Sequence, residues 1–191
     1  MKSNLLDTPT EIDKRIFRIN NFDYQKYAAL AKTEIYEENS NFIYKQELFK
    51  LKKIEKLRKE DFVDVADALD YLNSTGFIHG DLNKKNIIYT SDGFKVIDFE
   101  PSLFQIKNGI NQLMVTLPYV LDSDLKNNHI TETTDKLGFI YFILRVTKQM
   151  VSSDVIKLCK SLDHENYLNI KLNEIKKMSY RKFIKRFFNK L

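Results

Sequence analysis

The sequence contains few of the residues that define several common classes of protein. Cys159 is the one cysteine among 191 residues, so no intrachain disulfide framework can form and a reducing compartment is the natural environment. Five glycines and three prolines, beside 43% hydrophobic residues, argue against disorder. The longest clean apolar run, residues 139–144, is far too short to cross a bilayer. Residues 1–13 lack the apolar core of a signal peptide, so we expect a soluble cytoplasmic protein.

Acidic residues are scarce only at the C-terminal end. Residues 171–191 hold eight Lys or Arg and a single acid, Glu174, a local charge of +7 that leaves −2 for the first 170 residues. The apolar positions of this end recur at helical spacing and form one stripe: Tyr180, Phe183, Ile184, Phe187, Phe188 and Leu191. One interpretation is a terminal helix docked on the protein. Another is an interfacial helix that places residues 177–191 on an anionic membrane. Nucleic acid is disfavoured because no base-stacking platform accompanies the charge.

Glycine is absent before Gly76, which excludes a Gly-rich phosphate-binding loop from the N-terminal part. Alternation predicts a strand over residues 11–19 that carries Lys14. A helix is expected from Asp23 to about residue 38, with Glu34 and Glu37 on it, and a strand over residues 42–49.

The middle of the chain has clearer patterns. Apolar residues at helical spacing predict a helix over residues 61–75, which Gly76 would end. Two short apolar runs, residues 86–89 and 94–99, flank a turn signal at residues 91–93 and predict a hairpin. A strongly apolar helix is expected from Thr134 to about residue 146. Two of the three histidines, His129 and His164, are interpreted as ordinary surface or loop residues.

Between the helix and the far side of the hairpin lies a group of polar residues suited to phosphoryl transfer. Such a reaction needs a carboxylate near the attacking hydroxyl and oxygen ligands that hold magnesium against the phosphates. Asp81 suits the first role, and Asn86 and Asp98 suit the second. The turn between the two strands would bring Asp98 beside the loop that holds Asp81 and Asn86.

The segment His79-Gly80-Asp81-Leu82-Asn83-Lys84-Lys85-Asn86, followed by Asp98-Phe99-Glu100, resembles the catalytic loop and metal-binding triplet of the protein-kinase-like superfamily. The resemblance covers residues 61–145. It implies ATP and Mg²⁺ as cofactors, Asp81 as the catalytic carboxylate, and Asn86 and Asp98 as metal ligands. It also implies that Asp135 clamps the backbone of the loop and that His79 is a scaffold residue.

The sequence departs from the family pattern at three positions, and these departures narrow the set of kinases that it resembles. Gly80 stands where many regulated protein kinases have an Arg, Asn83 stands where serine/threonine kinases usually have a Lys, and Glu100 replaces a Gly. The pattern is most similar to that of lipopolysaccharide-core (heptose or Kdo) kinases. On this resemblance Lys14 would bind the ATP phosphates, with Glu34 or Glu37 as its partner.

The expected fold is therefore α+β and protein-kinase-like, with a reduced N-lobe over residues 1–57 and a mainly helical C-lobe over residues 58–191. The resemblance implies an ATP- and Mg²⁺-dependent phosphotransferase whose acceptor is a hydroxyl of a lipopolysaccharide-core sugar or related envelope glycolipid. It would work in the cytoplasm or at the inner face of the membrane. Two alternatives stay open, a minimal bacterial serine/threonine kinase and a catalytically silent pseudokinase that serves as a binding module.

Overall fold

The computed structural model describes residues 9–39, 41–54, 57–99, 119–127 and 130–188. Its N-terminal elements are α1 (Pro9–Asn20), β1 (Thr33–Glu38), β2 (Asn41–Gln46) and α2 (Glu60–Ser74). They are followed by β3 (Ile87–Thr90), β4 (Gly93–Val96), α4 (Asp122–Lys126), α5 (Glu132–Val146), α6 (Ser152–Ser161), α7 (His164–Leu168), α8 (Leu172–Lys177) and α9 (Tyr180–Phe188). This mixture of helices and small antiparallel sheets confirms the α+β class.

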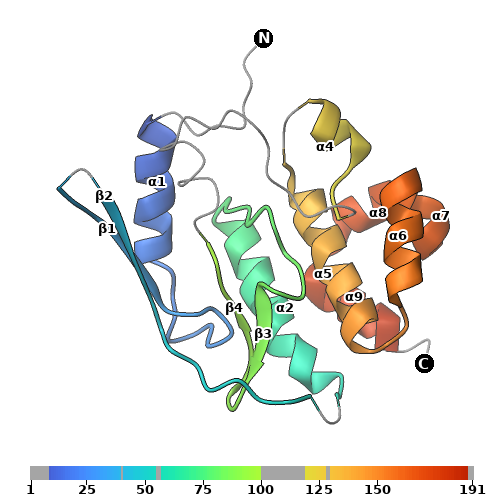
Figure 1. The fold of residues 1–191 in the computed structure, drawn as a ribbon, viewed down its shortest axis with the longest axis horizontal. Helices are drawn as coiled ribbons and strands as arrows, with labels where there is room; N and C mark the ends of the chain where they lie inside the picture. The colour runs from blue at the N-terminus through green and yellow to red at the C-terminus, as the bar shows by residue number, and fades with distance from the viewer. Residues whose placement is uncertain (1–8, 40, 55–56, 100–118, 128–129, 189–191) are drawn as a thin grey trace.

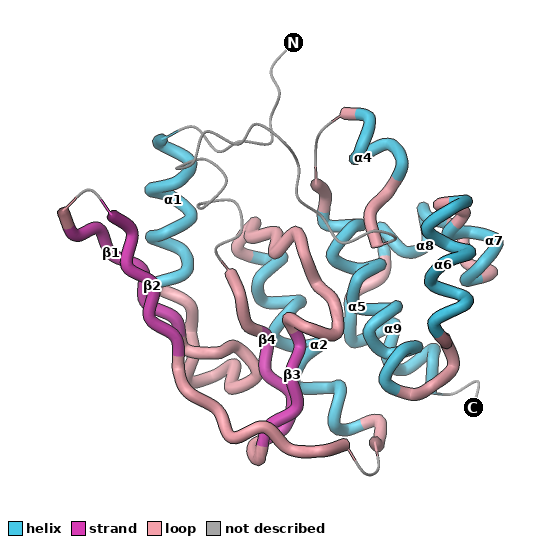
Figure 2. The backbone as a smooth tube through the Cα atoms, in the orientation of Figure 1, coloured by secondary structure: helices cyan, strands magenta, loops and turns pink. Residues whose placement is uncertain are grey.

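The elements are arranged in three groups (Figure 1). Helix α1 and the hairpin β1–β2 lie at one end, helices α5 to α9 lie at the other, and α2 with the hairpin β3–β4 lies between them. Figure 2 shows that loops make up much of the connection between the first group and the middle one. Two isolated bridges join these groups, Leu30 to Val96 and Leu51 to Thr90. The division into lobes near residue 57 stays a prediction.

The prediction for the N-terminal part was wrong, because its first two elements have the opposite types. Residues 11–19 belong to helix α1, in which the buried Ile19 and the half-buried Ile16 lie one turn apart. Residues 23–32 contain turns and no helix, and the predicted helix gives way to strand β1 at Thr33. In β1 the side chains of Thr33 and Ile35 are buried and Glu34 between them is exposed, the period of two that a strand requires.

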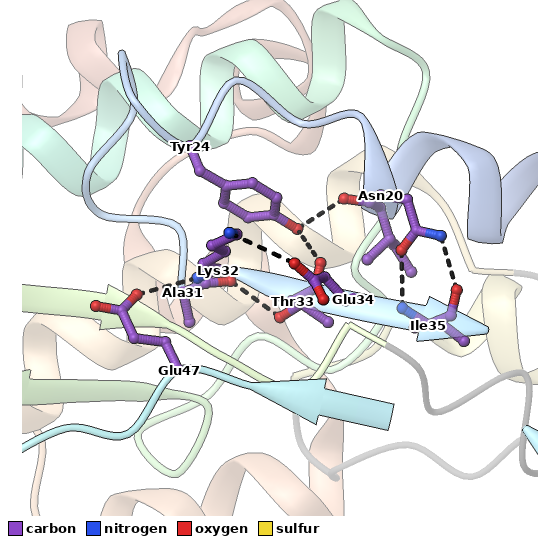
Figure 3. Close-up of polar contacts among 9 residues, drawn as sticks. Asn20, Tyr24, Ala31, Lys32, Thr33, Glu34, Ile35 and Glu47 are labelled. Carbon is purple, nitrogen blue, oxygen red and sulfur yellow. Dashed lines mark hydrogen bonds and ion pairs between the residues drawn. The ribbon is translucent and has the colours of Figure 1, made fainter. Parts of the chain in front are cut away.

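Side-chain hydrogen bonds explain why this stretch is extended (Figure 3). The amide of Asn20 donates to the Ile35 carbonyl at 2.7 Å and accepts from the Ile35 N–H at 2.8 Å, as a neighbouring strand would. The Tyr24 hydroxyl lies 2.7 Å from the carbonyl of Ile19 and 3.2 Å from that of Thr33. Ile35 is held by Asn20, which lies 15 positions earlier and outside residues 23–38, so a pattern confined to those residues did not contain this contact.

The predicted strand over residues 42–49 is confirmed in its first part only. Strand β2 pairs with β1 and ends at Gln46. The chain then follows the edge of the other hairpin, where the Lys52 N–H donates to Tyr89 at 3.0 Å and the Ser91 N–H donates to Lys50 at 3.2 Å.

The predicted helix over residues 61–75 is confirmed within one residue at each end. Its inward face is fully buried and consists of Phe62, Val65, Ala66, Ala68, Leu69 and Leu72. Gly76 has φ +71°, the left-handed conformation that favours glycine at the end of a helix. The hairpin is also confirmed, with Ile87 opposite Val96 and Thr90 opposite Gly93.

Helix α5 begins two residues before the predicted start and is the central helix of the C-terminal group. Its residues from Thr133 to Ile143 are all buried, so the helix is enclosed on every side. Helix α9 packs against α2 with Tyr180, Phe183 and Ile184 buried. Asp70 of α2 caps its first turn by accepting the Tyr180 N–H at 2.9 Å. No helix in the described ranges combines the length and the apolarity that crossing a membrane requires.

Candidate functional site

The loop between α2 and β3 fixes the Asp81 carboxylate with two amide side chains. Asn83 Nδ2 donates to one carboxylate oxygen at 2.9 Å, and Asn86 Nδ2 donates to the other at 3.0 Å. Both amide groups also donate to the main-chain carbonyl of Asp81, at 3.1 and 2.9 Å. Asn83 and Asn86 are buried and Asp81 is half-buried. The carboxylate is therefore held in one orientation at the surface of the loop.

The hairpin brings the backbone next to Asp98 onto the same loop. The Ile97 N–H donates to the Asn86 carbonyl at 2.9 Å, and His79 Nε2 lies 2.8 Å from the Ile97 carbonyl. Because a carbonyl only accepts, Nε2 carries the proton in this arrangement. His79 is buried and its ring packs against Phe99, with centroids 5.6 Å apart. His79 thus holds the backbone beside Asp98, a contact that a scaffold residue would make.

Asp98 has an unusual backbone conformation, with φ +66°. A left-handed conformation at a residue other than glycine costs free energy and is found preferentially at functional sites. The half-buried Asp98 side chain makes no hydrogen bond or ion pair that is recorded within the described ranges. The structure thus holds the Asp81 carboxylate beside Asn86, and it brings the backbone next to Asp98 onto the same loop.

Asp135 clamps this loop from helix α5. Its two carboxylate oxygens accept the N–H groups of His79 at 2.6 Å and Gly80 at 2.8 Å, so the contact expected from the resemblance is present. Burial raises the pKa of the Asp135 carboxyl above its usual value, while the charge of His79 and the two N–H bonds act in the opposite direction.

Two glycines allow this close approach. Gly80 has φ +88°, and a Cβ atom there would lie 3.3 Å from Ile130 Cδ1. A side chain such as Arg at this position would be strained by the backbone alone. Gly138, one turn after Asp135, faces the loop so closely that a Cβ atom would lie 2.2 Å from the Leu82 carbonyl oxygen.

Arg15 is a site residue that the sequence did not reveal. From helix α1 its guanidinium donates to the carbonyls of Ile78 at 3.1 Å and Phe99 at 3.1 Å, with a longer contact of 3.5 Å to His79. It also stacks over the Phe77 ring at 4.2 Å. Arg15 therefore ties the loop to the segment that carries Asp98. No local pattern signals this role, because the partners lie 63 to 84 positions away.

Lys14 and its expected partners do not lie on the elements that were predicted for them. Lys14 is exposed on helix α1 instead of lying on a strand, while Glu34 and Glu37 are exposed on strand β1 instead of lying on a helix. Glu34 pairs with Lys32 at 3.4 Å. A role for Lys14 in phosphate binding stays a prediction that no described contact supports.

A cleft of about 600 Å³ lies away from these residues, between the turns after α1 and strand β4. Its lining includes Lys32, Glu47 and Lys95 but none of the predicted site residues. These groups already have partners within the protein. Glu47 accepts the Lys32 N–H at 3.2 Å, and Lys95 donates to the Ala28 carbonyl at 2.5 Å. The cleft alone therefore does not indicate a ligand.

Asn86 and Asp98 carry oxygen atoms of the kind that magnesium prefers. Because the NH₂ group of Asn86 donates a hydrogen bond to Asp81, the amide oxygen of Asn86 points away from Asp81. The Asp98 carboxylate offers two further oxygen atoms of the hard type that magnesium prefers. Within the part of the chain that is described, no three His, Cys, Asp or Glu side chains form a metal-binding cluster. A magnesium ion bound with ATP needs only one or two protein groups, because phosphates and water fill the other positions.

His164 is buried, so its interpretation as a surface or loop residue was wrong. Its Nδ1 lies 2.8 Å from the Tyr141 hydroxyl and its Nε2 lies 3.1 Å from the Val120 carbonyl. It thereby ties residues 119–121 to α5. The predictions for Glu100 and His129 lie outside the described residues.

No protein-family model matches this sequence, and a search of curated proteins finds no significant match.

Proposed function

We propose that this protein is an ATP- and Mg²⁺-dependent phosphotransferase of the protein-kinase-like class, with a reduced N-lobe and a helical C-lobe. The observation that supports the proposal is the Asp81 carboxylate held by Asn83 and Asn86, on a loop that also binds the backbone beside Asp98. The order of elements supports it too, with helix, polar loop, hairpin and a buried helix whose Asp135 clamps the loop.

The reaction would be an in-line transfer of the ATP γ-phosphoryl group to a hydroxyl. Asp81 orients that hydroxyl and takes its proton as the oxygen attacks phosphorus and the bond to the β-phosphate oxygen breaks, releasing ADP. Asn83 and Asn86 hold the carboxylate of Asp81 in position for this step. Asn86 and Asp98 would hold magnesium, which neutralises charge on the phosphates.

The acceptor we propose is a sugar hydroxyl of a lipopolysaccharide core or related envelope glycolipid, phosphorylated on the cytoplasmic side. Its support is the loop pattern, and Gly80 adds to it. The left-handed backbone at Gly80 disfavours the Arg with which many regulated protein kinases bind a phosphorylated loop. A protein serine or threonine is the alternative acceptor.

A second candidate is a catalytically silent binding module. The observation in its favour is the small N-terminal part, where the described residues before α2 form one helix and one hairpin without a lysine-bearing strand next to the site. In this case ATP would bind without turnover.

The test is phosphotransfer and ATP hydrolysis with magnesium, for the wild type and two variants. We expect Asp81→Asn to lower turnover by roughly 10²- to 10⁴-fold, and the exposed turn variant Asp92→Asn to leave it unchanged. Nucleotide binding without turnover in the wild type would favour the silent module. Absence of both binding and turnover would refute the proposal.

A further inference from the structure

The apolar face of α9 is already used inside the protein. Tyr180, Phe183 and Ile184 are between 0% and 6% exposed. The Tyr180 ring lies 5.3 Å from that of Phe139, and the Phe188 ring lies 5.5 Å from that of Phe62. An interfacial helix that inserts its apolar side into a bilayer would first have to leave this core. Residues 180–188 therefore form a helix docked on the protein, the first of the interpretations of the basic C-terminal end.

The arginines of α9 are also engaged with the protein. Arg181 pairs with Asp67 of α2 at 2.5 Å, and Arg186 pairs with Glu174 of α8 at 2.8 Å. Glu174 is the single acid of residues 171–191. Each of these arginines thus has an acidic partner within the protein, and the single acid of residues 171–191 is one of the two.

Four lysines of α8 and α9 are exposed, and we call this set the lysine face: Lys176, Lys177, Lys182 and Lys185. All four are exposed, and none has an ion pair recorded within the described ranges. The first two end α8 and the other two lie on α9, and only Met178 and Ser179 separate the helices. Figure 1 shows α8 and α9 in the group of helices at the opposite end from hairpin β1–β2.

We propose that the lysine face binds the anionic headgroups of a membrane by charge alone, while α9 stays docked. Lysine is a compact point charge suited to a diffuse layer of phosphates, and each lysine near such a surface strengthens binding by roughly five-fold. RNA is less favoured, because the aromatic rings of α9 pack into the protein, with Tyr180 and Phe183 buried and Phe187 and Phe188 half-buried. The proposal does not depend on the phosphotransferase activity.

The experiment is sedimentation of the full chain with vesicles of phosphatidylcholine, with and without phosphatidylglycerol. The test variant reverses the charge of the lysine face: Lys176→Glu, Lys177→Glu, Lys182→Glu and Lys185→Glu. The control variant makes the same change in net charge at four exposed lysines elsewhere: Lys26→Glu, Lys50→Glu, Lys52→Glu and Lys53→Glu.

We expect the wild type and the control variant to bind only the anionic vesicles and to be released by high salt. The test variant should bind at least about ten-fold more weakly. Thermal unfolding of both variants checks that the fold is intact, and slow amide exchange in α9 on vesicles checks that the helix stays docked. The proposal is overturned if the wild type does not bind, if both variants lose binding equally, or if α9 exchanges rapidly on the vesicles. A short RNA that binds the lysine face while anionic vesicles do not would also overturn it.

Discussion

At the scale of single residues, the main chain between Ile78 and Gly80 is held from both sides. The Arg15 guanidinium donates to the carbonyls of Ile78 and His79. The Asp135 carboxylate accepts the N–H groups of His79 and Gly80. Buried main-chain groups that lose their partners cost about 1–3 kcal/mol each. Asp81 follows directly, so the position of its carboxylate depends on these two side chains.

We therefore expect Arg15→Gln to lower kcat by at least ten-fold with a smaller change in KM, because Arg15 positions the loop without contacting substrate. Amide exchange at residues 79–81 should accelerate, which does not require activity to measure. Arg18→Gln is the matched control, since Arg18 lies on the same helix and makes one exposed bond of 3.1 Å to Gly76. Equal effects of the two substitutions would show that the helix as a whole, and not Arg15, is responsible.

Residues within one short segment were predictable, and residues from distant elements were not. Asp81 and Asn86 are five positions apart, and a hairpin with a clear turn signal brings the chain of Asp98 back to them. Arg15 and Gly138 act through contacts across the fold, and nothing near them in the sequence shows what they touch.

At the scale of elements, α5 supports the loop through the contact of Gly138 with the Leu82 carbonyl. Gly→Ala in a helix normally stabilises a protein by about 1 kcal/mol. Here we expect Gly138→Ala to lower the free energy of unfolding by about 1–3 kcal/mol, because the methyl group cannot fit beside a backbone oxygen. Chemical denaturation measures this, and amide exchange at Leu82 reports the shift of the loop.

Gly93→Ala provides the control, because it adds the same methyl group where no atom lies within 4 Å. Its φ of +100° makes it mildly destabilising, but exchange at Leu82 should not change. Stabilisation by Gly138→Ala would contradict the described packing of α5 on the loop.

His164, which joins α5 to residues 119–121, makes the free energy of unfolding depend on pH. Burial lowers the pKa of His164 below its ordinary value, so the folded state holds it neutral while the unfolded state protonates near pH 6.5. Its contribution to stability is present above that value and is lost as the pH falls through it. The difference in unfolding free energy between the wild type and His164→Gln should therefore shrink below about pH 6.5. A difference that does not vary with pH would show that His164 is not held neutral.

The elements predicted correctly are those whose own pattern determines them. Helix α2 has a full apolar face and a terminal glycine, and hairpin β3–β4 has a turn signal between two apolar runs. Helix α1 and strand β1 were mistaken for each other because each owes its type to partners elsewhere, such as Asn20 for Ile35. Tertiary contacts override weak local preference in such segments.

At the scale of the whole molecule, the middle group of elements carries the site and the flanking groups hold it. Arg15 reaches it from α1, and Asp135 reaches it from α5. The lysine face belongs to the last group, so contact with a membrane would orient the protein without using the groups that bind the loop.

We propose that Asn86 and Asp98 bind a divalent ion together with ATP beside Asp81. Diffraction from crystals grown with Mn²⁺ and a non-hydrolysable ATP analogue tests it most directly, because manganese is located by its anomalous signal. We predict a manganese ion bound by Asn86 Oδ1 and the Asp98 carboxylate, with the terminal phosphate directed toward Asp81. A nucleotide and metal bound at another place, or no metal beside Asp98 when nucleotide is bound, would contradict the claim.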